Sequence, residues 1–245
     1  MKLIQLNVWG GRLESSIYRL VEHEKPDILC WQEAIDFAGE VYSFFGTLKA
    51  FKLRFPEYKY IYYSPGIRFK FMNKNAEWGN CIVSRYKIAE KSTHWTHLSF
   101  INNFNFDDYD YNAHNFQHCV IEAAGRKLHV LNHHGYHIPD HKNGNEETLE
   151  QMKQIRQYVD KLGGPVVLAG DFNLAPHSKS LEVINRRLTN LSLKYKLRTT
   201  RTVLSSKTEV CDYIFVNDKI KVNYFSTSKT LVSDHVALIV EFELV

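Results

Sequence analysis

The segment VVLAGDFN, residues 166–173, places two polar residues directly after a short apolar run. An unbroken apolar run of this length is typical of a strand buried on both faces, and the GGP at residues 163–165 marks where the preceding element stops. Asp171 and Asn173 then lie just past the end of the strand. Strand ends commonly present rigid catalytic side chains, so the segment predicts a sheet-based fold with polar chemistry at one sheet edge.

The stretches on either side of this segment alternate between helical and extended patterns. Apolar residues at helical spacing predict an amphipathic helix over residues 149–162. At the N-terminus, a strand at 3–8, a helix at 13–21 and a strand at 28–31 indicate a β-α-β unit. Further helices are expected at 36–54 and 178–188, and further strands at 58–63, 81–84, 116–123, 127–132, 211–216, 222–225 and 236–242.

The composition predicts one large domain over residues 1–245. Hydrophobic residues make up 44% of the chain and charged residues 24%, which suits a sizeable core. We find no internal repeat or low-complexity linker that would divide it. The net charge of +4 permits an anionic substrate without requiring one. No apolar run is long enough to span a bilayer, and we expect a monomer.

The cysteines lie in apolar, strand-like stretches and are too far apart in sequence for a zinc knuckle or a redox pair: Cys30, Cys81, Cys119 and Cys211. We therefore expect buried free thiols. The first segment, MKLIQLN, becomes polar too soon for a secretory signal. Together these features predict a reducing, cytoplasmic setting.

A second polar group follows near the C-terminus, in the segment VSDH at residues 232–235. Asp234 can hold the imidazole of His235 in one tautomer, and Asp171 can take a proton from water. Asn173 can orient that water or a phosphate oxygen. An Asp-His pair combined with a Gly-Asp-x-Asn segment is typical of metal-assisted phosphoester hydrolases.

Six short motifs resemble those of the endonuclease/exonuclease/phosphatase superfamily, the deoxyribonuclease-I-like enzymes. They follow in the family's order: LNVW at 6–9, WQE at 31–33, LNHH at 131–134, GDFN at 170–173, CDYIFV at 211–216 and SDH at 233–235. Any one motif is weak, but the ordered set covers nearly the whole chain. The resemblance implies a four-layered α/β sandwich, in which two packed sheets, mainly antiparallel or mixed, are flanked by helices. It also implies phosphoester hydrolysis with Mg²⁺ or Mn²⁺.

The resemblance further implies where the metal binds. Glu33 would be the principal ligand, because a carboxylate oxygen suits a hard cation such as Mg²⁺. Asn7 would help to place the metal or a phosphate oxygen without adding charge. Asp234 would be a further metal ligand beside its contact with His235.

The other motif residues would take part in catalysis. Asp171 would activate or orient the attacking water, and Asn173 would hold water or phosphate beside it. His134 would donate to a nonbridging oxygen as negative charge builds there. Asp212 would assist the leaving group or position His134, and His235 would contact the phosphate or transfer a proton. The division between acid and base is left open.

Substrate contacts are expected from a basic run without acidic residues: Arg186, Arg187, Lys194, Lys196, Arg198, Arg201 and Lys207. Arg186, Arg187 and Arg198 are the candidates for contact with a phosphate backbone, and a solvated basic surface is an equal alternative. Aromatic residues between positions 100 and 116 can stack on bases at a site rim or pack on the core as a hairpin, and core packing is favoured.

The segment HHGYH at residues 133–137, followed by His141, raises the alternative of a zinc site. Gly135 and Pro139 argue against the helix that would place these histidines on one face. A loop that carries His134 is the favoured interpretation, with His137 as a further phosphate or metal contact.

Three functions remain open from the sequence. A metal-dependent phosphodiesterase or nuclease acting on nucleic acid or nucleotides is slightly favoured by the basic run. A phosphatase or phosphodiesterase for a small or lipid-derived phosphoester is the alternative. The tryptophan that commonly precedes the Asp-Tyr-Ile motif in nuclease branches is missing from residues 198–210, which argues against a specific DNA-repair enzyme. A catalytically silent binding module is disfavoured by the intact set Glu33, Asp171, Asn173, Asp234 and His235.

Overall fold

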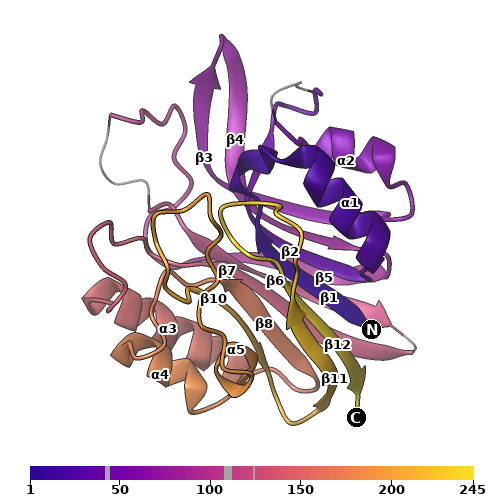
Figure 1. Cartoon of the computed structure of the whole chain (residues 1–245), viewed down its shortest axis with the longest axis vertical. Coiled ribbons are helices and arrows are strands. Elements are labelled where there is room, and N and C mark those ends of the chain that lie inside the picture. Colours follow the sequence, from indigo (N-terminus) through magenta and orange to yellow (C-terminus); the bar gives the residue numbers. More distant parts are fainter. Residues whose placement is uncertain (42–44, 108–111, 124) are drawn as a thin grey trace.

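Two six-stranded sheets pack face to face at the centre of the molecule, and helices cover their outer faces (Figure 1). The computed structural model describes residues 1–41, 45–107, 112–123 and 125–245. Apolar side chains from both sheets meet between them, including Leu3 and Ile82 from the first sheet and Val130 and Ile214 from the second. This arrangement confirms the four-layered α/β sandwich.

The first sheet contains the two ends of the chain. Its strands are β1 (Lys2–Asn7), β2 (Ile28–Asp36), β3 (Tyr60–Phe71), β4 (Lys74–Ser84), β11 (Ile220–Thr227) and β12 (Leu238–Leu244). Their order is β11-β12-β1-β2-β4-β3, and the sheet is mixed because β1 and β2 run parallel whereas β1 and β12 run antiparallel.

The second sheet is mixed in the same way. Its strands are β5 (Lys87–Trp95), β6 (Asn115–Ala123), β7 (Arg126–His134), β8 (Val166–Asp171), β9 (Thr189–Asn190) and β10 (Asp212–Val216). Their order is β5-β6-β7-β8-β10-β9, with β7 and β8 parallel and β8 and β10 antiparallel. The carboxyl ends of β7 and β8 therefore lie side by side, and β10 begins beside them.

The helices form the two outer layers (Figure 1). On the first sheet lie α1 (Glu14–Glu24) and α2 (Leu48–Arg54), with the short helix η1 (Trp9–Gly11) after β1. On the second sheet lie α3 (Glu146–Asp160), α4 (Lys179–Asn185) and α5 (Leu191–Lys194). A capping box between Asn145 and Thr148 begins α3, whose Met152, Ile155 and Val159 are buried against the sheet. No helix in the described residues is both long and apolar enough to cross a membrane.

The helix predicted at residues 36–54 was largely wrong. The strand β2 continues to Asp36, which pairs with Glu77. Of the described residues in the predicted range, only those of α2 are helical. Phe37 stacks on Phe45 in a separate small core, so the spacing of these aromatic residues reflects local packing rather than a helix face. Residues 42–44 lie outside the described residues.

The strand predicted at residues 58–63 is longer than expected. It runs through the SPG at residues 64–66 to Phe71, because a bulge between Pro65 and Ile67 accommodates the proline within the pairing with β4. The strand predicted at residues 81–84 begins earlier, at Lys74, and β5, β9 and α5 were not predicted. The other predicted strands and helices lie at or close to their ranges. The cysteines are all buried and free, as predicted.

Candidate active site

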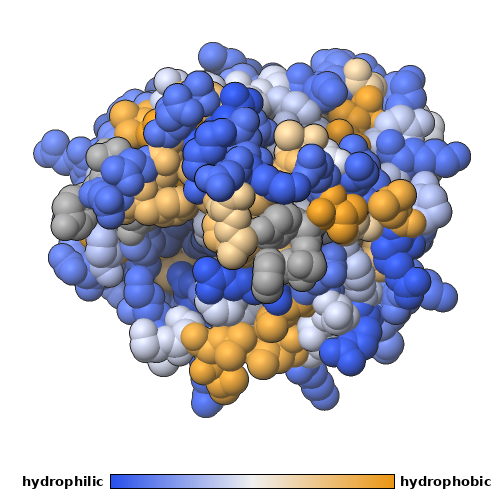
Figure 2. Space-filling model, turned by 90° about the horizontal axis from the view of Figure 1, so that it is seen from above, coloured by the Kyte–Doolittle hydropathy of each residue, from blue (hydrophilic) through white to orange (hydrophobic). Residues whose placement is uncertain are grey.

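Polar side chains from distant parts of the chain line one cavity of about 520 Å³, at the end of the sheets where β1, β7 and β8 finish. Figure 2 looks onto this end of the molecule and shows a hollow bordered by both hydrophilic and hydrophobic residues. The cavity brings together these predicted residues: Glu33, His134, His137, Asp171, Asn173, Asp234 and His235. Glu33 and His235 thus share one cavity although they come from opposite ends of the sequence.

Glu33 reaches the cavity through a bulge in β2. The register against β4 shifts between Trp31 and Ala34, and Glu33 adopts φ 56°. A positive φ is uncommon outside glycine, and a bulge of this kind redirects a side chain away from the regular pleat. Burial raises the pKa of the Glu33 carboxyl to about 7, although Asn7 donates a hydrogen bond to it.

Asn7, at the end of β1, connects carboxylates from the two sheets. Its Nδ2 donates to Oε1 of Glu33 at 2.9 Å and to Oδ2 of Asp171 at 3.2 Å. Its Oδ1 accepts a hydrogen bond from the backbone N–H of Trp9 at 3.1 Å. The amide oxygen is therefore already engaged, and the contacts of Asn7 position the two carboxylates.

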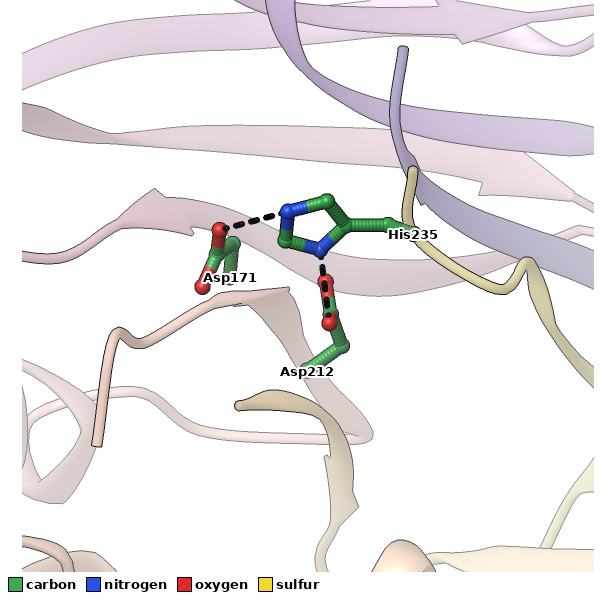
Figure 3. A group of neighbouring side chains, drawn as sticks. All are labelled: Asp171, Asp212 and His235. Atoms are coloured by element: carbon green, nitrogen blue, oxygen red, sulfur yellow. Dashed lines mark hydrogen bonds and ion pairs between the residues drawn. The ribbon is translucent and has the colours of Figure 1, made fainter. Parts of the chain in front are cut away.

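His235 lies between two buried aspartates, as Figure 3 shows. Its Nδ1 donates to Oδ2 of Asp212 at 2.9 Å, and its Nε2 is 3.6 Å from Oδ2 of Asp171. Asp234 approaches the ring only from the Nε2 side, at 3.9 Å. The residue that holds the ring through Nδ1 is therefore Asp212, and the sequence interpretation that assigned this contact to Asp234 was wrong. Asp212 also makes this contact in place of the predicted contact with His134.

Opposite charges control the protonation of this group. Burial disfavours a charged imidazole, but Asp212 and Asp171 outweigh it and raise the pKa of His235 to about 9. Burial also disfavours a charged Asp171, but His235 and Arg201 outweigh it and hold the pKa of that carboxyl well below its usual range. The ring and the carboxylate thus stabilise each other in their charged forms.

Asn173 is fixed by contacts at both ends of its amide. Its Oδ1 accepts from Nζ of Lys142 at 2.9 Å, and its Nδ2 donates to the carbonyl of Gly135 at 3.1 Å. Its backbone N–H donates to Oδ1 of Asp171 at 3.0 Å. Sequence reasoning missed Lys142, which is buried with its pKa lowered to about 8 by that burial, because nothing distinguishes this lysine from others in a polar loop.

Gly170 allows the strands that carry the site to lie close together. A Cβ at this position would be 2.0 Å from the carbonyl oxygen of His133, and its φ is +156°. Only glycine fits such an approach without shifting a backbone. This explains why a glycine precedes Asp171 at the end of β8.

His134 and His137 line the cavity, whereas His133 is fully buried and packs against Phe172. Burial lowers the pKa of His134 to about 3 and that of His137 to about 4, so both rings are neutral at neutral pH. Within the described residues, the histidines of segment 133–137 and His141 form no cluster of ligand atoms for zinc.

The buried His133 gives a prediction for acid stability. Burial lowers the pKa of its ring to about 3. A histidine in an unfolded chain titrates near pH ~6.5, so as pH falls the unfolded state takes up the proton first and stability is lost between the two pKa values. We expect His133 to lower the free energy of unfolding by about 2–3 kcal/mol at about pH 4.5, relative to neutral pH.

A His133→Gln variant removes the titration, so its free energy of unfolding should fall less between neutral pH and about pH 4.5. Urea unfolding of both proteins at the two pH values measures the difference. If the wild type and the variant differ in free energy of unfolding by the same amount at both pH values, the low pKa of His133 is contradicted.

The candidate basic residues do not reach the cavity. Arg186 pairs with Glu182 and Arg187 with Asp160 on the surface of α3 and α4, and Arg198 is exposed. Their candidacy as substrate contacts therefore receives no support from the structure. Two other members of the same run, Arg201 and Lys207, do line the cavity.

The aromatic stretch at residues 100–116 divides between the two expected roles. Phe104 is buried in the core, as the favoured interpretation expected, whereas Phe106 is exposed and lines the cavity together with Trp9 and Trp78. Tyr109 and Tyr111 lie outside the described residues.

Beneath the cavity, side-chain amides connect the two sheets. Gln5 donates to Oε1 of Gln32 at 2.8 Å and to Oδ1 of Asp212 at 3.0 Å. Gln32 donates to Oδ1 of Asn132, which in turn donates to Oε1 of Gln117 at 3.1 Å. Gln32 is fully buried in this network and does not line the cavity, although it belongs to the motif that implied a metal ligand.

Two groups of residues offer ligands for a divalent cation. Ligand atoms of Asp171, Asp212 and His235 all lie within 4.8 Å of one another, but the ring nitrogens already face the two carboxylates. Glu33, Asp171 and Asp234 also face one cavity, and each of the other two carboxylates raises the pKa of Glu33. Carboxylates that repel one another, with oxygen donors throughout, fit a hard cation such as Mg²⁺ or Mn²⁺.

Several solved structures share this fold. An endonuclease/exonuclease/phosphatase from Beutenbergia cavernae has a TM-score of 0.77 at 15% identity, covering 100% of this chain and 71% of that one. The mannosyl-6-phosphatase of Bacteroides thetaiotaomicron has a TM-score of 0.70 at 19% identity, covering 100% of each chain. TDP2 of D. rerio, complexed with a single-strand DNA product, has a TM-score of 0.70 at 13% identity, covering 99% of this chain and 98% of that one.

Similarity at these identities establishes the fold alone, and no curated protein matches the sequence significantly. The sequence itself matches the Endonuclease/Exonuclease/phosphatase family over residues 4–235, from the first strand to the buried histidine of the cavity. The match spans nearly the whole chain, and it confirms the resemblance seen in the six ordered motifs. The chain therefore belongs to the endonuclease/exonuclease/phosphatase family, whose members are generally phosphoester hydrolases.

Proposed function

We propose that this protein is a divalent-metal-dependent phosphoester hydrolase. The observation that carries the proposal is the buried row Asp212–His235–Asp171, which meets Glu33 and Asp234 in a single cavity. A carboxylate, an imidazole oriented by a second carboxylate, and spare oxygen ligands are the groups that metal-assisted hydrolysis of a phosphoester needs.

Glu33 and Asp234 would hold Mg²⁺ or Mn²⁺, which when bound polarises a phosphoryl oxygen. Asn7 keeps Glu33 and Asp171 in place through its Nδ2. Asp171, whose pKa lies well below its usual range, orients the attacking water by accepting a hydrogen bond from it. His235, with its Nδ1 fixed by Asp212, presents Nε2 to the phosphate or to the leaving oxygen.

Three further side chains complete the site. His134 is neutral and offers an N–H to a nonbridging oxygen, and His137 lies beside it in the cavity wall. Asn173 is held by Lys142 and Gly135, so its amide has one N–H left for water or phosphate.

For the substrate, we propose a nucleotide-type phosphoester, either a nucleotide or the end of a nucleic-acid strand. Trp9, Trp78 and Phe106 line the same cavity as the cations Arg201 and Lys207, which provides rings for a base and charges for its phosphate. TDP2, which shares the fold, was solved with a DNA product. A cytoplasmic setting and a monomeric state remain predictions from the sequence.

The alternative is a phosphatase for a small phosphoester such as a sugar phosphate. The size of the cavity favours this alternative, because about 520 Å³ suits a small molecule, and the exposed arginines of the basic run lie elsewhere. A mannosyl-6-phosphatase shares the fold.

A substrate panel tests the function and separates these alternatives. A bis-aryl phosphate, labelled single-stranded DNA and RNA, mononucleotides, sugar phosphates and phospholipid head groups would each be incubated with Mg²⁺, with Mn²⁺ and with a chelator. We expect metal-dependent hydrolysis that the chelator abolishes. An absence of hydrolysis across the panel with either metal would overturn the proposal.

The positions of the basic residues predict a shallow salt dependence for binding of single-stranded DNA. Only Arg201 and Lys207 of the basic run line the cavity. Two phosphate contacts correspond to a slope of about −1.4 in a plot of log affinity against log salt, since single strands lose ~0.7 per contact. Fluorescence anisotropy across a salt series measures it.

The same titration with a triple variant Arg186→Ala, Arg187→Ala and Arg198→Ala serves as the comparison. We expect an unchanged slope, because these side chains lie outside the cavity. If the triple variant instead loses the part of the slope that corresponds to two or three phosphate contacts, the nucleic acid binds along the exposed basic surface.

A further inference from the structure

Arg201 is a buried cation in the cavity that none of the sequence motifs contains. Its side chain is only 7% exposed, yet it lines the cavity. Its Nη1 contacts Nε2 of His235 and lies 3.8 Å from Oδ2 of Asp234. We propose that Arg201 binds the phosphoryl group of the substrate as a catalytic residue, an inference that rests on the proposed phosphoester hydrolysis.

The backbone around Arg201 is held on two sides. Arg201 forms an isolated antiparallel bridge with His235, and the N–H of Thr202 donates to the carbonyl of Asp234 at 2.9 Å. On the other side, Oγ1 of the fully buried Thr200 accepts hydrogen bonds from two backbone N–H groups at the start of β10. The guanidinium therefore has a fixed position relative to the Asp212–His235–Asp171 row, as a preorganised group requires.

The guanidinium retains an unused donor. Within the described part of the chain, its buried Nε has no hydrogen-bond acceptor. A buried donor without an acceptor costs free energy, and native structures seldom keep one without a reason. A phosphate oxygen in the cavity would supply the acceptor, and a guanidinium can bind phosphate through two parallel N–H groups.

A purely structural role would be to neutralise the aspartates. Burial disfavours the charged guanidinium, but Asp171 and Asp212 outweigh it and hold the pKa of Arg201 above its usual value. His235 already lies between the same two carboxylates. One charged imidazole leaves this pair of aspartates with a net negative charge that Arg201 can neutralise. Neutralisation does not explain, however, why the buried Nε of Arg201 faces no hydrogen-bond acceptor in the described residues.

The test compares Arg201→Ala and Arg201→Lys with Arg54→Ala, a matched control at an exposed arginine that pairs with Glu22 and does not line the cavity. We expect Arg201→Ala to lower the turnover number by about 10²–10³, as for loss of one preorganised donor. Millimolar guanidinium should restore part of that activity, because it can occupy the space left by the side chain. The control should keep the wild-type rate.

Calorimetric titration with inorganic phosphate, in the presence of Mg²⁺, gives a readout without turnover. We expect phosphate affinity to fall at least tenfold in Arg201→Ala and less in Arg201→Lys. Unchanged phosphate affinity in Arg201→Ala, together with no rescue by guanidinium, would overturn the proposal and leave neutralisation as the role of Arg201.

If Arg201→Ala does not fold, as judged by urea unfolding, Arg201→Lys decides. Lysine keeps the charge but cannot bind phosphate through two parallel groups, so unchanged phosphate affinity in that variant would also overturn the proposal. A wild-type protein that binds phosphate through Arg201 but hydrolyses nothing in the substrate panel would instead refute the proposed hydrolase activity alone.

Discussion

Replacing His235 by glutamine should lower the turnover number by about 10²–10⁴, the usual range for loss of a positioned acid–base group. The ring is fixed by Asp212 at Nδ1 and faces Asp171 through Nε2. Glutamine keeps a hydrogen-bonding side chain of similar size but cannot carry a positive charge or transfer a proton. Steady-state kinetics on the best substrate of the panel measures the loss, and thermal unfolding verifies that the variant is folded.

The contact between Asp212 and His235 gives this prediction an internal control. Asp212→Asn alone should also reduce turnover, because the ring loses the carboxylate that orients it. The double variant should be little worse than His235→Gln, because residues that act as one unit show strongly non-additive effects. Independent, additive losses, or a His235→Gln protein with the wild-type rate, would contradict the assignment of the site.

Glu33→Gln should raise the metal concentration needed for half-maximal activity at least tenfold and lower the rate at saturating metal. The amide removes a negative charge from a group of carboxylates that includes Asp171 and Asp234. Mg²⁺ and Mn²⁺ prefer charged oxygen ligands, so this change should weaken metal binding directly. Titration of Mn²⁺ followed by electron paramagnetic resonance measures the affinity without substrate.

Glu22→Gln is the matched control for this experiment. Glu22 lies on the exposed side of α1, where it pairs with Arg54, and it does not line the cavity. Its metal titration should match that of the wild type. Equal affinities in Glu33→Gln and the wild type would show that Glu33 is not a metal ligand.

Much of the fold could be predicted because its strands have simple apolar patterns. The run at residues 166–169 and the helix face of Met152, Ile155 and Val159 both follow from periodicity. The layered arrangement of the sheets came from motif order, since strand patterns do not specify which strands pair. The helix expected at residues 36–54 failed because aromatic residues in a local cluster imitate helical spacing.

The contacts within the site were harder to predict than its members. Asp234 and Asp212 were both candidates, but only the packing of the two sheets shows that Asp212 contacts Nδ1 of His235. Arg201 stood in a basic run where exposed arginines are equally common, so charge patterning favoured its neighbours instead. Lys142 gave no signal, because burial of a loop lysine depends on tertiary packing.

The amide network beneath the cavity bears on how the protein would lose catalytic activity. Glu33 lies in the first sheet and His235 in the segment just before β12 of that sheet, whereas Asp171 and Asp212 lie in the second sheet. Gln5 of β1 hydrogen-bonds to Asp212 across the two sheets. A small shift of one sheet relative to the other would move His235 away from Asp171 and Asp212 while every strand stayed intact. We therefore expect catalytic activity to be lost at a lower temperature or denaturant concentration than the secondary structure that circular dichroism detects.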